Sequence, residues 1–298
     1  MKLLLVVTIL LMASVCMANG QVKIRPSDIP ADVQWPHFMS IRISPPWDQQ
    51  GEWEIRSPET IGSNHGLLFI DHRRPDMLPV TNPSNEPKWH TENDGSLFYA
   101  CRLDNGVRFA VKMTPGKNDV SIFSTFTNGF REHLNNIGNQ YCLIQKGVKG
   151  FEDPKAERTF ILVNGNWISL ANTKPGQPNK GELPFFIVTN TRDQAPLEKV
   201  KIDRSWWADE QDNIPLIATV SEDGKHIVGL AFDNSYKIMT NACIPCIHAD
   251  PKYPDCMRGN TVSIRGKIYF VEGKLDDLLP LFYRDFPEWK NRPAFKRS

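Results

Sequence analysis

The chain has 298 residues, with 35 lysines and arginines against 34 aspartates and glutamates, and 40% of its residues are hydrophobic. This composition supplies a large core and excludes intrinsic disorder. The nearly neutral charge, without any basic block, excludes nucleic acid as the expected partner and argues against electrostatic capture by anionic membranes.

The first twenty residues have the features of a secretory signal peptide. Lys2 precedes the short apolar run 3–12, and small residues follow, with plausible cleavage after Ala18 or Gly20. The run is too short to span a bilayer, and no later segment is apolar enough to do so. We therefore expect a secreted or periplasmic protein without a transmembrane segment. Lipidation at Cys16 and a retained anchor are the alternatives.

Residues 21–94 are rich in proline, glycine and polar residues. Short strands are expected at 37–43 and 66–72, but the prolines between 75 and 87 make a long helix or a central strand unfavourable. We expect this segment to wrap the outside of the same domain.

Residues 95–298 carry short alternating runs separated by turn sequences. Strands are expected at 96–103, 107–113, 120–127, 137–145, 158–163, 167–170, 185–189, 214–221, 227–232 and 261–271. Apolar residues with 3.6-residue spacing predict one short helix over 275–286. The expected fold is mainly β: a large antiparallel two-sheet β-sandwich with one short C-terminal helix.

A cysteine-rich stretch, 241–256, lies between strand-like segments and is expected to be a rigid loop. A disulfide between Cys246 and Cys256 is one interpretation, since secreted thiols tend to oxidise. A structural metal held by Cys243, Cys246, His248 and Cys256 is the other, because three thiolates and an imidazole complete a tetrahedral zinc site. The disulfide is favoured, so no cofactor is expected.

Three groups are candidates for chemistry or ligand binding. His248 with nearby Asp250 suits general acid–base catalysis, and the alternative is a histidine that only ties down a turn. His133 in the polar bend Arg131-Glu132-His133 is a second candidate, against a solvated loop histidine. Trp206 and Trp207, followed by carboxylates, suit stacking against sugar rings.

The order of strand, Asn105-Gly106 turn, strand, then VSIFSTFTN running into a strand that ends in YCLI, resembles the β-sandwich of the galactose-mutarotase-like superfamily. The resemblance covers Ser96 to Phe270. It implies a carbohydrate or polysaccharide as partner, and a histidine, either His133 or His248, acting with an acidic residue. It leaves two functions open: a lyase or epimerase acting on sugars, and a non-catalytic glycan-binding or extracellular interaction module.

Overall fold

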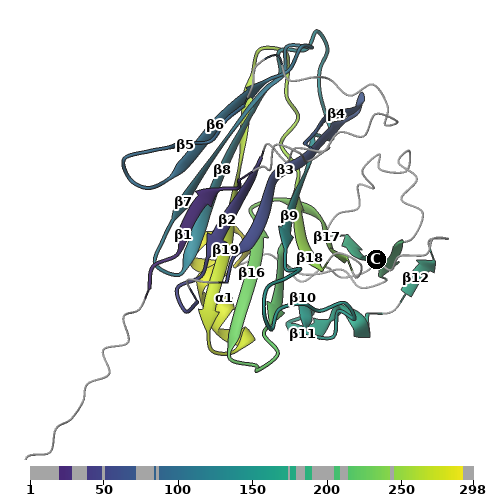
Figure 1. Cartoon of the computed structure of the whole chain (residues 1–298). Coiled ribbons are helices and arrows are strands. Elements are labelled where there is room, and N and C mark those ends of the chain that lie inside the picture. Colours follow the sequence, from purple (N-terminus) through teal and green to yellow (C-terminus); the bar gives the residue numbers. More distant parts are fainter. Residues whose placement is uncertain are drawn as a thin grey trace, which may run out of the picture.

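The computed structural model describes residues 20–28, 39–48, 51–71, 84, 87–173, 175–178, 185–189, 205–208, 214–241 and 245–290. Within these residues two large β-sheets pack face to face, and one short helix lies against the second sheet (Figure 1). The mainly β, two-sheet sandwich expected from the sequence is confirmed.

The first sheet follows the order β1-β2-β3-β9-β18-β17-β13-β14-β12, with β4 paired to β3. Its pairings are antiparallel except for β13 with β14. The strands are β1 (Lys23–Pro26), β2 (Ser40–Ser44), β3 (Trp53–Ser63), β4 (Gly66–Ile70), β9 (Gly138–Ile144), β12 (Pro175–Pro178), β13 (Phe185–Thr189), β14 (Ser205–Ala208), β17 (Ser235–Asn241) and β18 (Cys246–Pro251).

The second sheet follows the order β11-β10-β15-β16-β19-β8-β7-β6-β5 and is antiparallel. Its strands are β5 (His90–Thr91), β6 (Leu97–Arg102), β7 (Arg108–Pro115), β8 (Asp119–Thr127), β10 (Thr159–Val163), β11 (Asn166–Ser169), β15 (Leu216–Val220), β16 (His226–Phe232) and β19 (Thr261–Glu272).

The main core lies between the two sheets. Alternate residues of a strand point to opposite faces, so each sheet sends one set of side chains inward. Ile55, Leu143 and Ile247 enter the core from the first sheet, and Val111 and Ile268 enter it from the second. All five are fully buried. In β3, β9 and β18 the positions between these inward residues therefore face away from the core.

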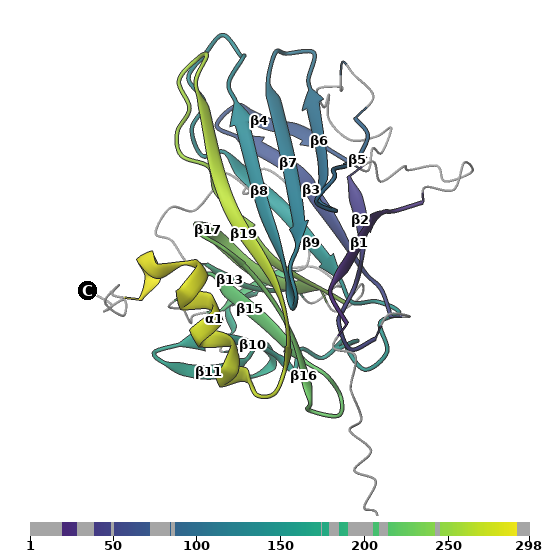
Figure 2. The same cartoon turned by 90° about the vertical axis from the view of Figure 1, so that its left-hand side faces the viewer.

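Helix α1 (Leu278–Asp285) covers the outer face of the second sheet and follows a 3₁₀ turn over Leu275–Asp277 (Figure 2). Leu278 and Phe282 are buried against that face, as is Phe286 just beyond the helix. A Cβ at Gly229 in β16 would lie 3.0 Å from Leu278 Cδ2, so the missing side chain allows the helix to approach closely. The helix expected over 275–286 thus packs with its apolar stripe inward.

Two expectations for the fold need correction. Residues 21–94 do not simply wrap the sandwich, because β2 and β3 are internal strands of the first sheet and Ile41 and Trp53 belong to the core. The stretch 241–256 is not a loop throughout, because 246–251 forms β18 between β9 and β17. β18 was missed because the cysteines and prolines in and around it are typical of a cross-linked loop. None of the described helices is long and apolar enough to cross a membrane.

Candidate functional site

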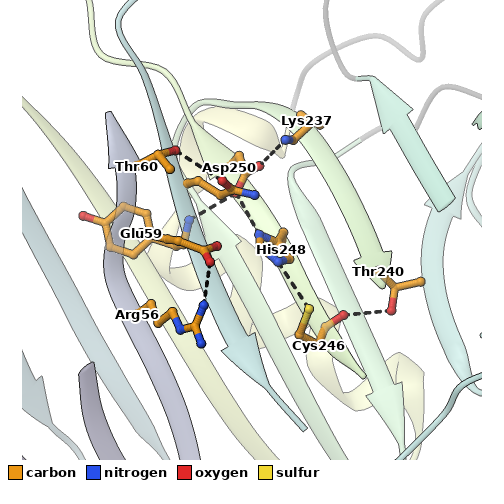
Figure 3. A network of polar contacts seen from close by, with 10 residues as sticks. Arg56, Glu59, Thr60, Lys237, Thr240, Cys246, His248 and Asp250 are labelled. Atoms are coloured by element: carbon orange, nitrogen blue, oxygen red, sulfur yellow. Dashed lines mark hydrogen bonds and ion pairs between the residues drawn. The ribbon is translucent and has the colours of Figure 1, made fainter. Parts of the chain in front are cut away.

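A group of polar side chains gathers on the outer face of the first sheet, which is turned away from the core. It comes from four neighbouring strands, β3, β9, β18 and β17, and we call it the outer-face cluster (Figure 3). Its members are Arg56, Glu59, Thr60, Gln140, Cys142, Lys237, Cys246, His248 and Asp250.

Strand register brings these residues together. His248 in β18 is paired with Cys142 in β9 on one side and with Met239 in β17 on the other. Cys142 is in turn paired with Arg56 in β3. A register shift between Arg56 and Thr60 places additional residues in β3, among them Glu59. The cluster therefore depends on three regions that are far apart in the sequence: β3, β9 and the consecutive strands β17 and β18.

Asp250 is the most heavily engaged member. Its Oδ2 lies 2.8 Å from Lys237 Nζ, and its Oδ1 lies 3.3 Å from His248 Nδ1. The backbone N–H of Tyr141 also donates to Oδ1, over 3.2 Å. Burial by itself raises the pKa of Asp250, but the charges of Lys237 and His248 outweigh burial, and the pKa falls below its ordinary value. Asp250 is therefore a buried carboxylate.

His248 bridges the carboxylate and the thiols. Its Nε2 lies 3.4 Å from Cys246 Sγ, on the side of the ring opposite Asp250. Burial lowers the pKa of His248, while Cys142 and Asp250 raise it, and the balance is upward. The contact with Cys246, together with burial, raises the pKa of Cys142 well above its ordinary value. At neutral pH Cys142 is then a thiol.

Solvent reaches the opposite end of the cluster. The Arg56 and Glu59 side chains form an ion pair of 2.7 Å and keep 19% and 10% of their surface exposed, against 3% for His248. Thr60 donates to the Gln140 side chain over 3.2 Å, and both residues are half-buried. Beyond Arg56, Glu54 pairs with Arg42 at 3.0 Å. Hydrogen-bonding groups therefore continue from the accessible edge to the buried end.

A separate open depression of about 370 Å³ lies on the second sheet. It is lined by β6, β7, β8 and β19, and its polar side chains include Arg102, Arg108, Thr125 and Thr261. It contains no carboxylate or histidine. Among the described residues it is therefore a weaker candidate for chemistry than the outer-face cluster.

The residues proposed from the sequence do not all meet. His248 and Asp250 are in contact, as their spacing of two along one strand requires. His133 and Arg131 instead lie exposed in the bend between β8 and β9, where Arg131 pairs with Glu132 at 3.1 Å. Trp206 and Trp207 lie in β14, of which the structure describes only the backbone. The catalytic and ligand-binding roles assigned to these residues remain predictions.

The cysteine pairing expected from the sequence is not found. Cys246 and Cys256 are both free thiols, and Cys256 Sγ donates to the Asn260 carbonyl at 3.2 Å rather than approaching Cys246. The expected metal set needs the same correction, since Cys142 takes the place beside Cys246 and His248 that we expected Cys256 to occupy. Cys243 lies outside the described residues.

Several cluster members were not identified as site residues from the sequence. Cys142 lies in an apolar strand-like run and gave no sign of a site, and Lys237 gave no signal beyond being a lysine in a hydrophobic segment. Lys237 lies directly opposite Asp250 across β17 and β18. A lysine within a strand that is otherwise buried is the one sign that an opposite charge faces it.

The chain is similar to several solved structures, among them galactose mutarotase-like proteins. A galactose mutarotase-like protein from Lactobacillus casei is 10% identical, with 74% of this chain and 85% of that one covered and a TM-score of 0.42. An Escherichia coli protein assigned as an aldose 1-epimerase is 7% identical, with 79% and 97% covered and a TM-score of 0.46. Both proteins are of the type that the sequence was expected to resemble.

A third match is an α-N-acetylgalactosaminidase from Bifidobacterium bifidum, 10% identical, with 91% of this chain and 38% of that one covered and a TM-score of 0.46. No protein-family model matches the sequence, and no curated protein is similar to it. At identities of 10% or less, these matches concern the fold only. The function of the outer-face cluster must be judged from its own side chains.

Proposed function

We propose that this protein is a secreted β-sandwich protein that binds a carbohydrate at the accessible edge of the outer-face cluster, around Arg56 and Glu59. The observation that supports the proposal is the charge balance of the cluster. Arg56 pairs with Glu59 and Lys237 pairs with Asp250, so the two ion pairs cancel. A surface rich in donors and acceptors, whose charged groups are paired with one another, suits a neutral ligand with many hydroxyl groups.

The partly exposed groups provide both kinds of hydrogen bond. The Glu59 carboxylate accepts from ligand hydroxyls, and the Arg56 guanidinium donates to them. Thr60 and Gln140 add neutral groups that do both. Hydrogen bonds to charged groups are worth about 1.5–3 kcal/mol each, which is enough for selective binding of a small sugar.

The test is a binding screen of the purified protein against a panel of polysaccharides and oligosaccharides. Glu59→Gln keeps the shape of the side chain and removes its charge, so we expect it to weaken binding at least about tenfold. Glu132→Gln is the matched control, since Glu132 also pairs with an arginine but lies exposed in the bend between β8 and β9.

The control variant is expected to bind like the unchanged protein. Loss of binding in Glu132→Gln but not in Glu59→Gln would move the ligand surface to the bend and contradict the proposal. The same mixtures should be examined for new reducing or unsaturated ends. Such products favour a lyase or another carbohydrate-active enzyme, and binding without products favours the non-catalytic module.

A further inference from the structure

Two thiols and one imidazole converge at the buried end of the outer-face cluster. The Sγ atoms of Cys142 and Cys246 and a ring nitrogen of His248 all lie within 4.8 Å of one another. All three side chains are buried, and they come from the neighbouring strands β9 and β18. Both strands lie inside the first sheet, so the backbone that carries these three groups is held on both sides.

From this arrangement we infer that Cys142, Cys246 and His248 form a binding site for a zinc ion. Thiolate and imidazole together are ligands that Zn²⁺ takes readily. The inference does not depend on the carbohydrate proposal, since it concerns the buried end of the cluster and a different ligand. It also gives His248 a role as a metal ligand, in place of the acid–base role predicted from the sequence.

The distances fit a tetrahedral ion. Zinc bonds of about 2.3 Å to sulfur and about 2.0 Å to nitrogen place these two ligand atoms about 3.5 Å apart. Cys246 Sγ and His248 Nε2 are 3.4 Å apart. The ion therefore fits between them with little movement, and Cys142 is the third ligand. Three protein ligands leave the fourth position to a water molecule or another ligand.

The orientation of the His248 ring supports the same conclusion. Nδ1 lies 3.3 Å from Asp250 Oδ1, so Nε2 is the nitrogen that faces the thiols. Histidines that bind metals usually donate their other ring N–H to a carboxylate or carbonyl, which fixes the ring and strengthens the ligand. Asp250 is in turn held by Lys237 and by the Tyr141 N–H. It acts as a positioning residue for His248.

The charges of the surroundings also suit a divalent cation. Two thiolates neutralise Zn²⁺, and the neighbouring pairs Arg56–Glu59 and Lys237–Asp250 are already balanced. Burying the loaded site therefore leaves no uncompensated charge, which would otherwise be costly. Arg56, paired with Cys142 across the strands, lies on the side where thiolate charge develops. Metal binding must displace the thiol protons, so affinity is expected to rise with pH.

The first experiment uses the full mature chain, purified with its thiols reduced and then equilibrated with Zn²⁺. We expect one tightly bound zinc per chain. X-ray absorption at the zinc edge should give two sulfur ligands at about 2.3 Å and one imidazole nitrogen at about 2.0 Å. Bound zinc should also protect Cys142 and Cys246 from alkylation, read by mass spectrometry. These measurements need no variant and therefore do not depend on whether variants fold.

Variants then assign the ligands. Cys142→Ser and Cys246→Ser should each lower zinc affinity by more than about a hundredfold, a larger effect than the 10–100-fold expected for Asp250→Asn as a positioning residue. Cys256→Ser is the matched control, because Cys256 is also buried and free but bonds the Asn260 carbonyl. It should keep full affinity. Circular dichroism checks that each variant is folded.

Three results would overturn the inference. The first is fewer than two sulfur ligands on the bound zinc. The second is equal zinc affinity in Cys142→Ser and in the unchanged chain. The third is a Cys142–Cys246 disulfide in the protein as exported, because it would remove both thiolates. If the unchanged protein binds no sugar, or if Glu59→Gln binds sugar normally, the carbohydrate proposal fails. Neither result affects the zinc measurements, so the two proposals can be tested separately.

Discussion

Lys237 Nζ lies 2.8 Å from Asp250 Oδ2, on directly paired positions of β17 and β18, and both side chains are almost completely buried. Breaking a buried pair by removing one partner leaves the other charge without compensation. We expect Lys237→Met to lower the free energy of unfolding by about 3–5 kcal/mol, measured by urea denaturation.

A control for this variant is Lys112→Met. Lys112 lies 3.6 Å from Glu92 and 3.5 Å from Asp94, and all three side chains are at least one-third exposed. Ion pairs exposed to water contribute less than about 1 kcal/mol to the free energy of unfolding. This variant should therefore be about as stable as the unchanged protein. Adding Asp250→Asn to Lys237→Met should recover part of the loss. Equal effects of the two lysine variants would contradict the buried pair.

A second prediction concerns the close approach of β16 and β19. A Cβ at Gly266 would lie 2.5 Å from a ring carbon of Phe232, which is fully buried and stacks on Tyr141 at 4.6 Å. Gly266→Ala should therefore destabilise the protein by about 1–3 kcal/mol through overpacking. In Gly62→Ala the nearest atom is 3.9 Å away, so that variant should be neutral or slightly stabilising, as thermal unfolding can show.

The third prediction tests the helix. The Phe282 side chain of α1 is fully buried against the second sheet. Phe282→Ala should therefore lower the free energy of unfolding by about 3–5 kcal/mol. Arg284, two residues later, keeps 57% of its side chain exposed, and Arg284→Ala should cost less than about 1 kcal/mol. If the denaturation curves of the two variants coincide, the helix does not contribute to the core.

The fourth prediction concerns export. If residues 1–20 are a signal peptide, the mature protein begins near Asn19 or Gln21. Expression of the whole chain in a secreting host, followed by N-terminal sequencing of the exported protein, measures this directly. A chain that begins at Met1 in the medium would contradict the prediction.

Much of the fold could be predicted from local patterns. The Asn105-Gly106 turn between two alternating runs is a hairpin signal, and β6 and β7 pair there in the expected way. The helix also followed its apolar spacing, with Leu278 and Phe282 buried. Both elements can be predicted from residues that are close together in the sequence. β18 could not, because its place in the sheet depends on pairing with β9, a strand that lies far away in the sequence.

The candidate site was predicted only in part, for the same reason. His248 and Asp250 are two residues apart, so their contact follows from the strand alone. Cys142 and Glu59 join them through pairings between strands that lie far apart in the chain. Lys237 joins them from the preceding strand, through a register that the sequence alone did not indicate. Proline, cysteine and histidine also gave 246–251 the composition of a cross-linked loop, and that impression produced the incorrect disulfide.

The position of β18 also has a consequence for how quickly the chain reaches its native state. Asp250 and the Tyr141 N–H, which meet at the β9–β18 seam, are 109 positions apart in the sequence. Lys267 and Asp119 join β19 to β8 across 148 positions. Proteins dominated by such distant pairings fold slowly, because long loops must close before the contacts form. During synthesis β9 can pair with β3 early, but its other edge must remain unpaired until β18 has emerged.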